Sequence, residues 1–93
     1  MAKVGGTLTA NTNAEVLGAD MTRYSLVIQN ISSTDTIYFE FGGAASTTAA
    51  DDSWVLLPQQ TIILNGAEWP EIKGSVNLKS TGTPQYLVRD SGL

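Results

Sequence analysis

The chain has 93 residues, a net charge of −4 and a pI near 4.4, which leaves room for one small domain. It has no cysteine and no histidine, so disulfides, thiolate metal sites and catalysis by either residue are excluded. Its five Lys and Arg residues are scattered along an acidic chain, which argues against a nucleic-acid partner. The longest apolar run is residues 54–57, so we expect no membrane-spanning segment.

Residues 1–6 are small for the most part and contain no apolar stretch of the kind that a signal peptide has. We expect a flexible arm over 1–6 that is either disordered or becomes ordered on a neighbouring molecule. No linker or internal repeat divides the rest of the chain. The expected organisation is therefore an arm over 1–6 and a single β-sandwich domain over 7–93.

Beyond the arm, short segments of alternating polarity are separated by Gly, Asn, Asp, Ser and Pro. The predicted strands are 7–10, 14–17, 24–30, 36–41, 54–57, 61–64, 76–80 and 85–89. We expect 24–30 and 36–41 to form a hairpin, and 61–64 to return along 54–57 after a turn at 58–60. The spacing of about ten residues predicts an all-β fold: a small antiparallel β-sandwich or jelly-roll-like barrel of about seven to eight short strands.

Two sheets packed face to face would bury one face of each strand. The predicted core consists of Tyr24, Leu26, Ile28, Ile37, Phe39, Phe41, Leu56, Ile63, Val76, Leu78, Leu87 and one tryptophan, for which Trp54 is the better candidate. Gly42 and Gly43 are expected to end a strand where the backbone needs a positive φ or a close approach. One helical turn from Thr48 is a further prediction.

Catalytic patterns are weak. Lys79 and Ser80 are neighbours on an alternating strand, so their side chains point to opposite faces and do not form a Ser–Lys pair. Glu68 and Glu71 form a near pair of carboxylates, but they lie in a predicted loop, where solvated surface charge is the usual explanation. We expect no enzyme activity and no cofactor.

The acidic pair Asp51 and Asp52 has nearby hydroxyl groups at Thr47, Thr48 and Ser53. Oxygen ligands of this kind suit calcium, although the spacing matches no calcium loop, and solvated charge is the alternative. The sequence Asn30-Ile31-Ser32 fits the N-glycosylation pattern, which we discount because no secretion signal accompanies it.

Trp69 lies outside any clean alternation, before Pro70. It is either a loop anchor or an intermolecular contact, with stacking on a carbohydrate as a third option. The candidate interface residues are Met1, Ala2, Lys3, Val4, Trp69 and Pro70.

The middle of the chain resembles small virion proteins of tailed bacteriophages. The segments that carry the resemblance are YSLVIQN (24–30), IYFEFGGAA (37–45), the Leu-Pro turn at 57–61 and the C-terminal stretches 78–83 and 86–89. The resemblance covers roughly residues 21–90. The EWP segment at 68–70 has no counterpart in those proteins, and the chain has no fibre-like repeat or lysin motif.

The resemblance implies a head decoration or cement protein. Such a protein would bind the major capsid protein on the outside of the shell, associate with itself as a trimer or dimer, and be made in the host cytoplasm. The alternatives are a tail, baseplate or fibre-anchoring component and, from Trp69 alone, a carbohydrate-binding β-sandwich.

Overall fold

A computed structural model describes residues 3–46 and 53–92, which form eight strands and one short 3₁₀ helix. The elements are β1 (Lys3–Thr7), β2 (Ala14–Leu17), β3 (Arg23–Asn30), β4 (Ile37–Phe41), β5 (Trp54–Leu56), β6 (Thr61–Asn65), η2 (Pro70–Lys73), β7 (Val76–Lys79) and β8 (Gln85–Gly92). The all-β prediction is confirmed. The predicted helical turn from Thr48 lies outside the described residues.

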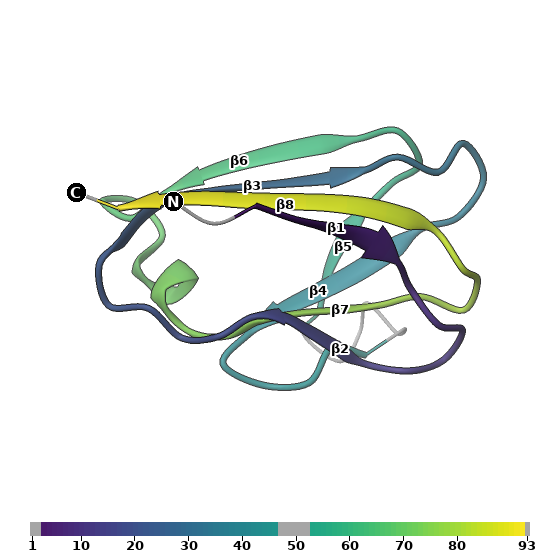
Figure 1. The fold of residues 1–93 in the computed structure, drawn as a ribbon, viewed down its shortest axis with the longest axis horizontal. Coiled ribbons are helices and arrows are strands. Elements are labelled where there is room, and N and C mark those ends of the chain that lie inside the picture. The colour runs from purple at the N-terminus through teal and green to yellow at the C-terminus, as the bar shows by residue number, and fades with distance from the viewer. Residues whose placement is uncertain (1–2, 47–52, 93) are drawn as a thin grey trace.

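The strands form two four-stranded antiparallel sheets packed face to face (Figure 1). The first sheet has the order β1-β8-β3-β6 and the second sheet has the order β2-β7-β4-β5. The pairs β1–β8, β2–β7, β3–β6 and β4–β5 are nested along the chain and alternate between the two sheets. This nested pairing is the jelly-roll arrangement, one of the two architectures that the sequence predicted.

The predicted hairpins are wrong. β3 and β4 lie in different sheets, and so do β5 and β6, because the chain crosses between sheets at residues 31–36 and 57–60. Buried Asn30 joins the two crossings: its Nδ2 donates to the carbonyl of Asp35 at 2.8 Å and to the carbonyls of Leu56 and Leu57 at 3.2 Å each. A polar segment after an alternating strand predicts a reversal, but it does not say which sheet the chain enters next.

The core lies between the sheets, and seven predicted core residues are fully buried in it. They are Leu26, Ile28, Ile37, Phe39, Leu56, Val76 and Leu78. Phe41 and Trp54 are half-buried and pack against this cluster. Gly42 has a φ of 78°, which confirms the expected positive φ at the end of β4.

Three predicted core residues are outside it. An irregularity between Arg23 and Ser25 in the pairing with β8 turns Tyr24 outward, where it is 42% exposed. On β6 the inward positions are Ile62 and Leu64, so Ile63 is 73% exposed. On β8 the inward positions are Tyr86, Val88 and Asp90, and Leu87 faces outward. Both 62–64 and 86–88 are continuous apolar runs, in which alternation does not identify the buried face.

The expected flexible arm is instead an edge strand over the part that the structure describes. β1 pairs with β8 over its full length, from Lys3 opposite Arg89 to Thr7 opposite Gln85. The missing side chain of Gly6 makes room for Tyr86, whose hydroxyl would lie 3.1 Å from an added Cβ. Main-chain pairing therefore stabilises a segment in which Val4 is the one apolar side chain larger than glycine, and a hydrophobic pattern cannot reveal it.

Candidate protein interaction surface

The outward side chains of the first sheet form one surface with a defined composition. Across the strands, Lys3 lies opposite Arg89, Arg89 opposite Val27, and Val27 opposite Ile63. The next row places Leu87 between Gly5 and Gln29. We call the outward side of β1, β8, β3 and β6 the first-sheet face.

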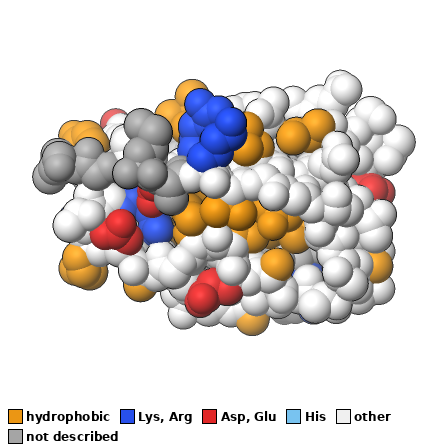
Figure 2. Space-filling view, viewed as in Figure 1, with side chains coloured by type: hydrophobic (Ala, Val, Ile, Leu, Met, Phe, Trp, Pro, Cys, Tyr) orange, Lys and Arg blue, Asp and Glu red, His pale blue; other side chains and the backbone are white. Residues whose placement is uncertain are grey.

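The first-sheet face is basic although the chain is acidic. Its cations are Lys3 and Arg89, which are neighbours across β1 and β8. The four strands contain one acidic residue, Asp90, and its side chain is buried between the sheets. Figure 2 shows Lys and Arg side chains at the upper margin of the molecule, above the first sheet. On the second sheet, by contrast, Glu15 and Glu40 flank Asn77.

The structure divides the predicted interface residues between opposite edges of the first sheet. Exposed Lys3 and half-buried Val4 lie on β1, and Figure 2 shows the band of hydrophobic side chains between the sheets on this side. Trp69 and Pro70 lie just after β6, at the other edge. These residues therefore do not form one continuous surface, and Met1 and Ala2 lie outside the described residues.

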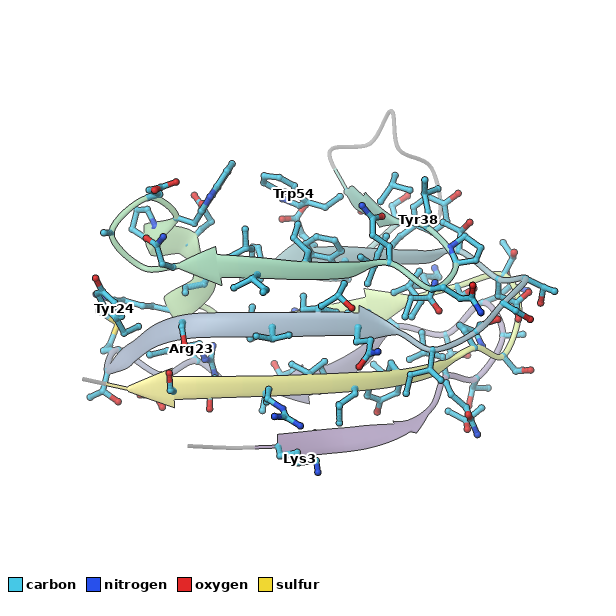
Figure 3. All side chains as sticks on the ribbon, turned by 90° about the horizontal axis from the view of Figure 1, so that it is seen from above. Lys3, Arg23, Tyr24, Tyr38 and Trp54 are labelled. Carbon is cyan, nitrogen blue, oxygen red and sulfur yellow. The ribbon has the colours of Figure 1, made fainter. Side chains whose placement is uncertain are left out.

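Trp69 is held in place by a second tryptophan. Its ring meets that of Trp54 edge-on, with centroids 4.9 Å apart and planes at 79°, and its backbone N–H donates to the carbonyl of Asn65 at 2.9 Å. Both indoles are half-buried against the core. In Figure 3 Trp54 lies beyond β6 on the side away from β3, so the pair closes the side of the sandwich between β5 and β6.

Sequence reasoning missed the buried ion pair of Arg23 and Asp90. The Nε of Arg23 donates to the carboxylate of Asp90 at 2.7 Å. The remaining guanidinium nitrogens donate to the carbonyls of Ile72, Gly74 and Gly18 at 2.7–2.9 Å. Arg23 thus joins β8, η2 and the end of β2 at one end of the sandwich. All of these guanidinium nitrogens donate to a buried carboxylate or to backbone carbonyls of the fold, so we assign Arg23 a role in stability.

The hydroxyl and amide groups that could have carried other chemistry are used by the fold. Ser80 Oγ donates to the carbonyl of Thr36 at 2.7 Å, and the Asn30 amide is buried at the sheet crossings, where no glycan would fit. The hydroxyl and the backbone N–H of Thr22 both donate to the carboxylate of Asp20. These two hydrogen bonds, the hydroxyl bond having the larger effect, lower the pKa of that carboxyl.

The other predicted chemistry has no built site in the described part of the chain. Glu68 and Glu71 are exposed, in agreement with solvated surface charge. The described residues contain no cluster of three metal-binding side chains and no pocket. Asp51 and Asp52, the possible calcium ligands, lie outside the described ranges. Within those ranges no helix has the length and hydrophobicity that a membrane crossing requires.

Comparisons with known proteins show the fold and no family. No protein-family model matches the chain, and no curated protein matches it. Among solved structures, the chain is similar to a de novo designed double-stranded β-helix determined by solution NMR. The TM-score is 0.58 at 14% identity, over 98% of this chain and 100% of the designed one. This likeness supports the two-sheet β-fold and carries no information on function.

Proposed function

We propose that this chain is a virion structural protein of a tailed bacteriophage, which binds the outside of the capsid and stabilises the shell by bridging capsid subunits. The observation that supports this proposal most directly is the first-sheet face. It presents Val27, Ile63 and Leu87 beside Lys3 and Arg89, with no acidic side chain. An acidic patch of the major capsid protein would complement it, and the cations would orient the encounter while apolar contact supplied affinity.

Self-association belongs to the same proposal. A contact of about 1,200–2,000 Å², repeated by symmetry over the shell, strengthens attachment through avidity even where each contact is modest. A trimer or dimer would match local shell symmetry. In this role the chain acts at the virion surface after synthesis in the host cytoplasm, and it needs no cofactor, nucleic acid, membrane or catalytic step.

The test uses undecorated heads of the phage that encodes the chain, imaged by electron microscopy after mixing with the purified protein. We expect ordered density outside the shell. The double variant Lys3→Glu/Arg89→Glu should bind at least about tenfold more weakly. Its control, Lys73→Glu/Lys79→Glu, makes the same charge change away from the first-sheet face and should bind as the wild type does. Absence of outer density would refute the proposal.

Two alternative functions can be tested by separate measurements. A tail, baseplate or fibre-anchoring component would occur in a dozen copies or fewer per virion, whereas decoration requires hundreds, so the copy number separates the two. A carbohydrate-binding role would require a free ring face on Trp69. The edge-on contact with Trp54 gives no support to that role, and a glycan screen with Trp69→Ala as control tests it.

A further inference from the structure

We propose that the free edge of β6 is the site at which a second copy of this chain binds, so that the two first sheets join into one continuous sheet with twofold symmetry. This inference names the surface through which the self-association in the proposed function would occur, but it does not rest on capsid binding, because it concerns the isolated protein.

The backbone of β6 offers hydrogen-bonding groups along its free edge. Asn30 N–H donates to the carbonyl of Gln60, and Gly66 N–H donates to the carbonyl of Tyr24. Because pairing alternates along an antiparallel ladder, Ile62 and Leu64 also direct their N–H and C=O groups toward β3. Thr61 and Ile63 therefore direct theirs away from the sheet, and no backbone bond joins them to another described segment.

The other edge strands carry features that hinder pairing, whereas β6 does not. β1 contains Lys3 and two glycines, β2 contains Glu15 and an irregular register, and β5 has three residues and a proline two positions later. Charges, irregularities and short length are devices that protect sheet edges. β6 has five uncharged residues and no proline, so two copies of an acidic chain can meet there without opposing like charges.

The outward N–H and C=O groups of Thr61 and Ile63 determine one register for the pairing of two β6 strands. In an antiparallel pair of β6 strands centred on Ile62, Thr61 lies opposite Ile63 of the second copy, and each such pair exchanges two backbone hydrogen bonds. A register centred on Ile63 would instead place Thr61 opposite Asn65, whose carbonyl already accepts the N–H of Trp69. The Ile62-centred register uses both free residues and leaves that bond in place.

Apolar side chains near β6 supply contact area that the pairing of two short strands would not provide by itself. Ile63 is 73% exposed and Leu57, just after β5, is 55% exposed. Half-buried Trp54 lies beyond β6 on the side away from β3 (Figure 3), and half-buried Trp69 contacts it edge-on. A stable interface needs about 1,200 Å² or more, and aromatic side chains are enriched in such interfaces. Apart from the joined β6 edges, the first-sheet faces of both copies would stay exposed on the same side of the joined, twisted sheet.

The test is analytical ultracentrifugation of the purified full chain across a wide concentration range. We expect a dimer. Ile63→Lys should raise the dissociation constant at least about 30-fold, because it places a charge within the joined edge. Leu87→Lys, which makes the same change on the same face two strands away, should leave it unchanged within about threefold. Thr61→Pro removes an outward N–H that the fold does not use and should also weaken the dimer at least about tenfold.

Cross-linking tests the register, because the chain has no cysteine of its own. An equimolar mixture of Thr61→Cys and Ile63→Cys chains should form covalent dimers with a short thiol–thiol cross-linker faster than either variant alone. A monomeric wild type, a trimer, equal effects of Ile63→Lys and Leu87→Lys, or no preference in the mixture would each overturn the inference. Circular dichroism of every variant confirms that the fold is intact. Shell binding is measured separately, so the two proposals can fail independently.

Discussion

Replacement of Phe39 by alanine tests the packing between the sheets. Phe39 is fully buried in the middle of β4, opposite Leu78 on β7 and Trp54 on β5. Its ring stacks on that of Trp54 at 5.9 Å and meets Phe41 edge-on at 5.8 Å. The substitution therefore leaves a cavity at the centre of the core and removes two aromatic contacts.

Burial and geometry give the expected magnitude. Truncation of a core phenylalanine costs about 3–5 kcal/mol in all, and the loss of two aromatic pairs places Phe39 in the upper part of that range. We expect Phe39→Ala to lower the free energy of unfolding by about 4–5 kcal/mol, a large part of the stability of a small domain. The assay is urea denaturation followed by tryptophan fluorescence and circular dichroism, with a fit of both midpoint and slope.

A neighbouring position provides the control. Tyr38 precedes Phe39 on β4, is half-buried and faces the outside of the second sheet. Tyr38→Ala should cost less than half as much as Phe39→Ala. A loss below about 1 kcal/mol for Phe39→Ala, or a larger loss for Tyr38→Ala, would show that the assigned face of β4 is wrong.

Three further predictions concern polar groups. Arg23→Met removes the cation beside buried Asp90 and should destabilise the protein by about 3–5 kcal/mol in urea denaturation, whereas Arg23→Met/Asp90→Leu should recover part of the loss. Asn30→Ala leaves the carbonyls at the two sheet crossings without their donor and should cost about 2–3 kcal/mol by the same assay; a loss under about 0.5 kcal/mol would contradict that role. The hydrogen bonds from Thr22 lower the pKa of Asp20, so its carboxylate stabilises the folded state above the pKa of the unfolded chain and loses that contribution as the pH falls through the folded pKa. Stability measured against pH should therefore decline less steeply below about pH 4 in Asp20→Asn than in the wild type, and NMR titration of Asp20 at or above its ordinary pKa would rule this out.

Some of the fold follows from local sequence pattern. Leu26 and Ile28, and likewise Ile37 and Phe39, alternate with smaller or more polar residues, so both the strand and its buried face could be predicted. Gly42 could be predicted to take a positive φ because it follows such a strand. The lack of cysteine and histidine limits the possible chemistry by composition alone.

Other features depend on which strands pair with one another, and no local sequence pattern predicts that pairing. Leu64 rather than Ile63 is buried because it pairs with Leu26, and Val88 rather than Leu87 because it pairs with Ile28. β1 forms because its backbone pairs with that of β8, although its glycines give no hydrophobic pattern.

The same division applies to the proposed surfaces. Trp69 could be singled out from its surroundings in the sequence, but its contact with Trp54 could not. Lys3 and Arg89 come from the two ends of the chain and are neighbours only because β1 and β8 pair. Hydrophobic alternation is a property of each segment alone, so the sequence determines strands and many buried faces. Which strands become neighbours, and therefore which charges and edges lie together, depends on contacts between distant segments that only the folded chain brings together.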